Sequence, residues 1–348
     1  MKSASKRMAC AIACILCGLS FHLQAADSAP EAPHCRYVNL KTIPITYNDG
    51  GLKIEASINE QPVNMVLDTG ADTSTVSKHG AERLGLKLGH AGEVIGAGGE
   101  SRGYRARVDK FSIGPVEGKH LTLPVFWDSG LDEDEDGLVG ADFLFQRDLE
   151  LSIKSRQIKL LHPLNCKSDT NLAYWDHDAS FVDMEQAQPG TSANPGGDQG
   201  REVTVLLNGK KLRAKIDTGA TVTIIDLAAA KRAGITPESP GVVKLEGKSK
   251  GIGSKRKEIW KATFDSFALG DETVPHAKID IMDLWGSVRA DDPEVDTSEL
   301  PEMLLGADFL EKHHVLFAVS QRRFYFSYLG GGLYGSELDD VVSPTAAK

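Results

Sequence analysis

One pattern of apolar and polar positions occurs twice along the chain, at an offset of 149 residues. The stretch LKIEASINEQPVNMVLDTGA, residues 52–71, aligns without a gap with REVTVLLNGKKLRAKIDTGA, residues 201–220. In both copies apolar residues alternate with polar ones on either side of a turn, which is the pattern of a β-hairpin. The second strand of each hairpin runs into Asp-Thr-Gly-Ala. This predicts a buried strand that delivers a carboxylate to a tight turn.

The remaining elements of the pattern also come in pairs. Each copy continues into a short helix and then into a Gly-rich hairpin, at residues 94–114 and 250–270. A second shared signature follows, GLVGADFL in one copy and MLLGADFL in the other, and predicts a strand that enters a short helix. Behind it, residues 149–161 and 315–327 alternate as closing hairpins. The pattern therefore predicts a mainly β protein made of two similar units.

The length of 348 residues allows two domains, each with a core of ordinary size. We assign residues 36–166 to the first domain and residues 201–330 to the second. Residues 167–200 are expected to form a linker that could include the first strand of the second domain. Its last part is rich in Pro, Gly, Ser and Asn, which favours a loop. Residues 331–348 are expected to be a flexible tail.

The N-terminus has the pattern of a secretory signal. Lys2, Lys6 and Arg7 precede an apolar run without charges, and small residues follow at Ala25 and Ala26. Residues 1–25 are therefore predicted to be a signal peptide that is removed on export. The alternative is an uncleaved membrane anchor, although the run is short for a membrane span.

Charge and cysteine content restrict the partners of the exported chain. Loss of residues 1–25 leaves 36 basic and 49 acidic residues, a net charge of −13. This argues against nucleic acid or an anionic membrane as the main partner. Only Cys35 and Cys166 remain after export, and we expect them to form a disulfide, with two separate thiols as the alternative.

The repeated carboxylates, Asp68 and Asp217, are the candidate chemical groups. Two carboxyl groups held near contact cannot both ionise easily, so one keeps a proton while the other stays charged. The charged member can take a proton from water, and the protonated member can donate one to a carbonyl oxygen. No Ser or Cys nucleophile motif competes with this hypothesis. The plainer alternative is two capping aspartates in ordinary turns.

These motifs resemble those of the aspartic proteases, and the short units with Ala after Asp-Thr-Gly are more similar to the retropepsin-like branch. The resemblance covers nearly all of residues 36–330. It implies an all-β fold with two retropepsin-like β-barrel domains that form a pseudo-dimer in one chain, each with a short helix after the apolar-apolar-Gly motif. It also implies a catalytic pair, supporting residues in the two loops, a peptide or protein substrate, and no cofactor. The catalytic residues would be Asp68 and Asp217, and the supporting residues Thr69, Gly70, Thr218 and Gly219.

The resemblance also implies which residues contact the substrate. Asp72 is at a position that clamps the substrate main chain in retropepsins, whereas the second unit has Thr221, so we expect an asymmetric cleft. The tips of the two Gly-rich hairpins would close over the substrate as flaps, and basic residues flank the second tip. The expected substrate-binding residues are Ala71, Asp72, Ala220, Thr221, Gly98, Gly99, Ile252 and Gly253.

No metal site is expected. The acidic run from Asp132 to Asp136 begins like a calcium loop, but its twelfth position is Phe143, where a bidentate Glu is required. We interpret this run as a solvated loop. His313 and His314 have no partner at the spacing of metal ligands. Both are expected to lie on the surface.

The sequence thus predicts an aspartic endopeptidase in the periplasm of a Gram-negative bacterium, acting as a monomer and without a membrane contact after signal cleavage. One alternative is a catalytically silent peptide-binding or regulatory module on the same fold. Another is an enzyme in which equivalent halves pair between two chains. The substrate, the cleavage-site preference, the pH optimum and any need for self-processing do not follow from the sequence.

Overall fold

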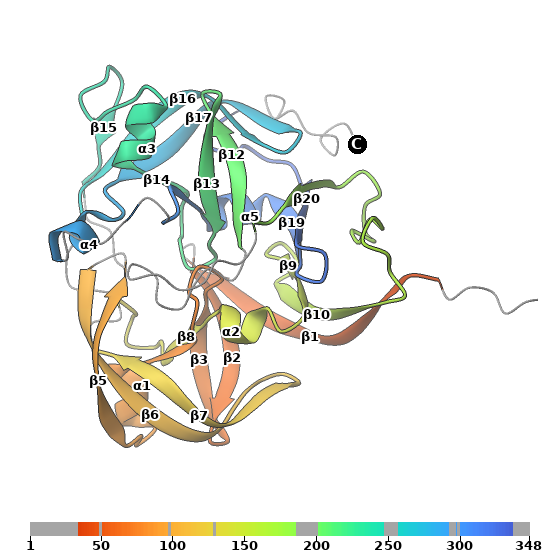
Figure 1. Cartoon of the computed structure of the whole chain (residues 1–348), viewed down its shortest axis with the longest axis vertical. Coiled ribbons are helices and arrows are strands. Elements are labelled where there is room, and N and C mark those ends of the chain that lie inside the picture. Colours follow the sequence, from red (N-terminus) through yellow and green to blue (C-terminus); the bar gives the residue numbers. More distant parts are fainter. Residues whose placement is uncertain are drawn as a thin grey trace, which may run out of the picture. The chain divides into compact units, whose positions relative to one another are not determined.

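The computed structural model describes residues 34–48, 51–96, 99–127, 130–185, 201–246, 257–291, 297 and 300–336. Strands dominate these residues and the helices are short (Figure 1). The predicted mainly β class is therefore confirmed. None of the helices in the described ranges has the length and apolar character needed to cross a membrane.

Apart from one helix, the two halves contain matching elements in the same order. In the first half these are β1 (Arg36–Asn48), β2 (Gly51–Ile58), β3 (Gln61–Leu67), β4 (Thr75–Ser77), α1 (Lys78–Arg83), β5 (Leu88–Gly96), β6 (Gly99–Ile113), β7 (Val116–Phe126), β8 (Gly137–Val139), α2 (Ala141–Leu144), β9 (Asp148–Ser152) and β10 (Gln157–Leu164). In the second half they are β11 (Ser180–Asp183), β12 (Glu202–Leu207), β13 (Lys210–Ile216), β14 (Ile224–Asp226), α3 (Leu227–Arg232), β15 (Val243–Lys244), β16 (Ile259–Leu269), β17 (Glu272–Met282), α4 (Gly286–Asp291), β18 (Met303–Leu305), α5 (Ala307–Glu311), β19 (His313–Ala318) and β20 (Arg323–Tyr328). Within the described residues, α4 is the one helix of the second half that has no counterpart in the first.

Each half closes into a β-barrel. The strand order is β2-β3-β8-β4-β7-β6-β5 in the first and β12-β13-β18-β14-β17-β16-β15 in the second, and each ring is closed by a further pairing, β2 with β6 and β12 with β16. The same topology twice in one chain is the predicted pseudo-dimer.

The alternating pattern of the sequence fills these barrels. In β2 every second side chain is buried, among them Leu52, Ile54 and Ile58, and the residues between them face outward. The hairpin that follows has the predicted turn, with positive φ angles of 48° at Asn59 and 65° at Glu60. Such a turn matches the twist of the strands that it connects. Pattern and turn together fix the register of each barrel wall.

A shared sheet joins the two barrels. The order β11-β20-β19-β9-β10-β1 continues directly into the first barrel, because β1 pairs with both β10 and β2. The closing hairpins that the sequence predicted are β9–β10 and β19–β20, and they pair with one another through β9 and β19. We call this pairing of β9 with β19 the seam.

β1 is one long strand with an irregularity between Asn39 and Lys41. One segment differs from the sequence-based assignment. Residues 331–336, which the sequence assigns to the flexible tail, pack on the second barrel, where Leu333 and Tyr334 are buried. Apolar and aromatic side chains thus continue the core beyond the last strand.

The disulfide forms as expected. Cys35, just before β1, is bonded to Cys166, just after β10, and the two are 131 residues apart in sequence. Beyond Cys166 the chain crosses the outer face of the shared sheet, where Leu172 and Ala173 pack against Tyr325. The bond therefore anchors the segment that covers this face.

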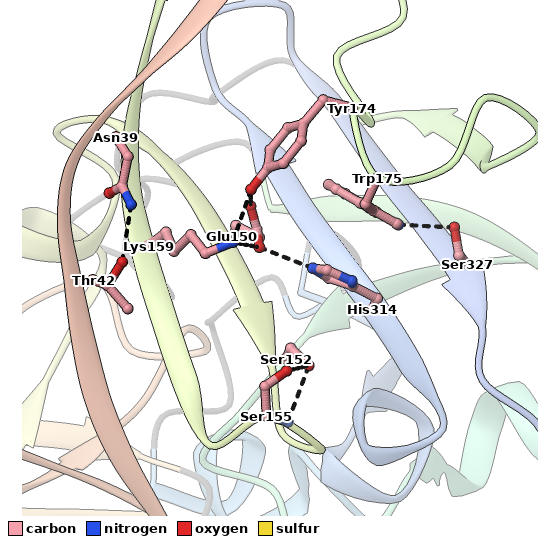
Figure 2. A network of polar contacts seen from close by, with 10 residues as sticks. All are labelled: Asn39, Thr42, Glu150, Ser152, Ser155, Lys159, Tyr174, Trp175, His314 and Ser327. Atoms are coloured by element: carbon pink, nitrogen blue, oxygen red, sulfur yellow. Dashed lines mark hydrogen bonds and ion pairs between the residues drawn. The ribbon is translucent and has the colours of Figure 1, made fainter.

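The seam carries a cluster of charged and aromatic groups (Figure 2). Glu150 on β9 is buried, and its carboxylate accepts hydrogen bonds from Lys159 Nζ at 2.8 Å and from the hydroxyl of Tyr174. His314 on β19 places its Nε2 3.0 Å from the same carboxylate and stacks its ring on Trp175 at 4.1 Å. His314 is thus a contact between the halves, and the expectation of a free surface histidine is wrong.

The prediction that His313 lies on the surface is also wrong. Its side chain is fully buried, with Nδ1 2.7 Å from the Phe309 carbonyl oxygen and Nε2 3.0 Å from both carboxylate oxygens of Glu272. Both ring nitrogens therefore lie next to oxygen atoms that can accept hydrogen bonds. The burial of His313 is offset by these contacts, which the sequence pattern does not reveal.

Candidate active site

Asp68 and Asp217 occupy matching places at the ends of buried strands. Asp68 follows β3, and its backbone N–H donates to the carbonyl of Val139 at the end of β8, at 3.0 Å. Asp217 follows β13, and its N–H donates to Leu305 at the end of β18, at 2.9 Å. The parallel pairings β3–β8 and β13–β18 therefore fix where each turn begins relative to the neighbouring strand.

Two threonines join the turns directly. The hydroxyl of Thr218 accepts from the N–H of Thr69 at 2.9 Å and donates to the carbonyl of Leu67 at 2.6 Å. The hydroxyl of Thr69 makes the matching pair, accepting from Thr218 at 3.0 Å and donating to Ile216 at 2.8 Å. Both side chains are buried. At about 1 kcal/mol for each buried hydrogen bond, this exchange stabilises the contact of the halves by on the order of 4 kcal/mol.

The glycines of the turns lie against the opposite carboxyl groups. A Cβ atom on Gly70 would lie 2.4 Å from the carboxyl carbon of Asp217, and one on Gly219 would lie 2.6 Å from that of Asp68. Neither distance is possible for real atoms. Glycine at both positions is thus what allows the two acidic side chains to approach one another.

The glycine of each turn lies against the carboxyl group of the other turn, and the charge of Asp217 acts on Asp68. Burial, and then the charge of Asp217, raise the pKa of Asp68 from 3.8 to about 8. Burial also raises the pKa of Asp217, but N–H groups oppose this effect, since Oδ1 accepts from Gly219 at 2.8 Å and from Ala220 at 3.2 Å. Asp68 Oδ1 accepts one such bond, from Ala71 at 2.9 Å. The pair therefore retains a proton at pH values where isolated carboxyl groups have lost theirs.

A second layer of hydrogen bonds supports each turn, and the sequence analysis did not assign it. Ser74 Oγ accepts from Gly140 N at 2.9 Å and donates to Asp142 Oδ1 at 2.6 Å. In the second half Thr223 Oγ1 accepts from Gly306 N at 3.0 Å and donates to Asp308 Oδ1 at 2.7 Å. The signal was present, because the GADFL signature has its Asp in both copies.

Asp72 has a partner within the chain. Arg201, which is almost fully buried, forms an ion pair with Asp72 and donates from a terminal guanidinium nitrogen (Nη1) to the carbonyl of Ala71 at 3.0 Å. Arg201 stands before β12 in the second half and so reaches the first turn from the other side. Its role was missed because the aligned position in the first half is Leu52, a core residue.

The flap residues are described only in part. Gly99 begins β6, whereas Gly98, Ile252 and Gly253 lie outside the described residues, as does the predicted signal peptide. α4 of the second half lies against β6. In the part of the chain that the structure describes, no three metal-ligating side chains come together.

The acidic run is less solvated than expected. Asp136 is buried. Its carboxylate accepts hydrogen bonds from Arg83 Nε at 2.7 Å and from the backbone N–H of Asn64 at 2.9 Å. Glu135, also buried, lies 3.1 Å from Lys53 Nζ. These contacts attach the run to the first barrel, because each buried carboxylate has a cationic partner.

The chain is similar to proteins of one family. A family model described as aspartyl protease matches residues 54–143 and 203–309, which together make up more than half of the chain. Among solved structures, a retropepsin-like aspartic protease from Rickettsia conorii has 22% identity and a TM-score of 0.28, over 37% of this chain and 95% of its own. An aspartic proteinase from Irpex lacteus has 12% identity and a TM-score of 0.44, over 86% of this chain and 99% of its own. The comparison with curated proteins gives no match.

Proposed function

The chain belongs to the aspartyl protease family, and on that premise we propose that it is an aspartic endopeptidase whose catalytic pair is Asp68 and Asp217. The observation that carries this proposal is the approach of two carboxyl groups, each against the glycine of the opposite turn, together with the raised pKa of Asp68. Such a pair holds an acid and a base next to each other, which is what the hydrolysis of a peptide bond by water requires.

The surroundings of the pair favour a division of roles. Asp217 accepts two backbone N–H bonds and Asp68 accepts one, so negative charge is better stabilised on Asp217. We assign Asp217 as the base that takes a proton from the attacking water. Asp68 keeps the shared proton and donates it to the carbonyl oxygen as the tetrahedral intermediate forms. The proton lost by water returns to the leaving amine through the same pair, and no covalent intermediate arises.

The proposed substrate is a peptide or protein segment in an extended conformation, which the predicted flaps would cover. The backbone groups of Ala71, Ala220 and Thr221 are the proposed contacts beside the catalytic pair. Asp72 is proposed as a contact too, with a charge already offset by Arg201. The two sides of the scissile bond would therefore meet different surroundings.

The proposed place of action is outside the inner membrane of a Gram-negative cell. The signal-like N-terminus supports export, and the disulfide between Cys35 and Cys166 is compatible with an oxidising compartment. The bonds that Thr69 and Thr218 exchange lie within one chain, which supports action as a monomer.

The test is cleavage of a diverse peptide mixture by the purified protein between pH 4 and 7.5, followed by mass spectrometry. Asp68→Asn and Asp217→Asn should each abolish cleavage, and Asp265→Asn, an exposed acidic position on β16, should not. Cleavage that survives in one active-site variant would favour pairing between chains. No cleavage by the parent protein at any pH would favour the peptide-binding module.

A further inference from the structure

The chain returns to the second barrel after its last strand. Beyond β20, two glycines with positive φ angles, Gly330 and Gly331, redirect the backbone. Leu333 and Tyr334 then insert into the core, with only 1% and 7% of their surfaces exposed. The carbonyl of Tyr334 accepts from Lys278 N on β17 at 2.8 Å. This segment is thus attached to the barrel by both its backbone and its side chains.

The hydroxyl of Tyr334 ends beside the second active-site turn, 2.9 Å from Thr223 Oγ1. A threonine hydroxyl has one hydrogen and two acceptor positions. Thr223 donates its hydrogen to Asp308 and accepts from Gly306 N. The remaining position can only accept, so Tyr334 is the donor. Burial, together with the charge of Asp308, raises the pKa of Tyr334 well above its ordinary value, so its hydroxyl keeps this proton.

The matching hydroxyl group of the first half has different partners. Ser74 stands where the second half has Thr223, and among the described residues its hydroxyl bonds Gly140 N, Asp142 and no tyrosine. The Tyr334 contact is therefore an asymmetry between the two turns. Tyr334 is also held in a strained backbone conformation, since its φ angle is 53°, a value that bulky residues seldom adopt.

Thr223 is connected to the Asp217 turn by short steps. The residue after Gly306 is Ala307, whose N–H donates to the carbonyl of Ala220 at 2.8 Å, and the residue before it is Leu305, which receives the N–H of Asp217. A Cβ atom on Gly306 would lie 2.5 Å from the backbone of the turn. A shift of Thr223 therefore displaces the backbone that orients Asp217.

We propose that Tyr334 is a positioning residue for Asp217, with its hydroxyl holding the second active-site turn through Thr223. This inference rests on the proposed function for its kinetic part and on geometry alone for its structural part. The ring of Tyr334 packs edge-on against Phe267, with ring centres 5.2 Å apart. Tyr334→Phe keeps this packing and removes only the hydroxyl.

The experiment compares Tyr334→Phe with Tyr325→Phe in the full chain. Tyr325 is a matched control, since it is also buried and its hydroxyl donates to Gln321 at 2.8 Å on the outer side of the shared sheet. Amide hydrogen exchange of residues 217–223 and 68–74 is measured by mass spectrometry. Peptide cleavage then gives kcat, KM and the pH profile.

Tyr334→Phe should speed exchange in residues 217–223 by about tenfold and leave residues 68–74 unchanged. It should lower kcat by about tenfold, leave KM within about twofold and shift the pH profile, because the carboxyl pair is less well aligned. Tyr325→Phe should do none of this. Unchanged exchange in Tyr334→Phe, or the same local change in both variants, overturns the inference.

The two proposals fail in different ways. If the parent protein cleaves no peptide, the proposed function falls, and the exchange measurement still decides whether Tyr334 holds the turn. If the parent cleaves peptides and Tyr334→Phe keeps its kcat and pH profile, the positioning role falls and the proposed function stands.

Discussion

Replacing one carboxyl group of the Asp68–Asp217 pair by an amide should stabilise the fold at neutral pH. The pKa of Asp68 rises from 3.8 to about 8 on folding, so between these values the folded chain holds a proton that the unfolded chain has released. The folded state then binds more protons, and the free energy of unfolding falls as the pH rises through this window. An Asn side chain is neutral at every pH and removes this dependence.

The magnitude follows from the size of the shift. One pKa unit corresponds to about 1.4 kcal/mol. The pKa is about 8 in the folded chain and 3.8 in the unfolded chain. This difference lowers the free energy of unfolding at pH 7 by at most about 4 kcal/mol relative to its value at low pH. Both carboxyl groups keep some contact with solvent, which reduces the effect to on the order of 2 kcal/mol. In a chain of this size that corresponds to a rise in Tm of about 4 °C.

The assay is thermal unfolding, followed by circular dichroism at pH 4, 5, 6, 7 and 8. Asp68→Asn and Asp217→Asn should unfold near the parent's Tm at pH 4 and progressively above it toward pH 7. Asp265→Asn, which removes an exposed charge, controls for the change in net charge. A gain in Tm that does not depend on pH, or a loss of stability at pH 7, would refute the shared proton.

Three further outcomes are expected, each measured by urea denaturation. Thr218→Val should lower the free energy of unfolding by about 2 kcal/mol, since it removes two side-chain hydrogen bonds between the halves. Thr218→Ser keeps the hydroxyl and should leave the free energy of unfolding unchanged. Arg201→Leu should cost about 3 kcal/mol because it leaves the Asp72 carboxylate without its ion pair. The double variant Arg201→Leu, Asp72→Thr has at both positions the residue of the matching position in the other half, and it should recover most of the lost stability. A double variant no more stable than Arg201→Leu alone would contradict this. Burial raises the pKa of Glu150, but hydrogen bonds from His314 and its other partners outweigh burial and leave the pKa below its ordinary value. The stability that Glu150 contributes is therefore present above its unfolded pKa and is lost as the pH falls through its lower folded pKa. Glu150→Gln should be less stable than the parent at pH 7 by about 2 kcal/mol and should lose less on acidification to pH 3, and an unchanged acid slope would argue against the pairing.

The barrels and the two Asp-Thr-Gly turns were predictable because their causes are local. The alternation in residues 52–58 determines which side chains enter the first barrel. The glycine after each Asp-Thr determines which backbone can approach a carboxylate. Both features occur twice in register, so each copy supports the interpretation of the other.

Contacts between distant segments were not predictable in the same way. His313 and His314 resemble a surface pair in sequence, yet their carboxylate partners lie 41 and 164 residues away. Arg201 occupies a position that is apolar in the other copy, so the repeat itself pointed away from an ion pair. Buried charge depends on the partner that the fold supplies. A single sequence does not specify that partner.

The seam has a consequence for the order of events during synthesis. β9 and β19 are separated by more than 150 residues. Closing so long a loop costs conformational entropy, and this cost is lower once each barrel has formed its own hairpins. Asp68 emerges from the ribosome 149 residues before Asp217, and an unfinished chain carries one carboxyl group without the other. The time at which the last strands pair therefore sets the earliest moment at which the proposed protease can act.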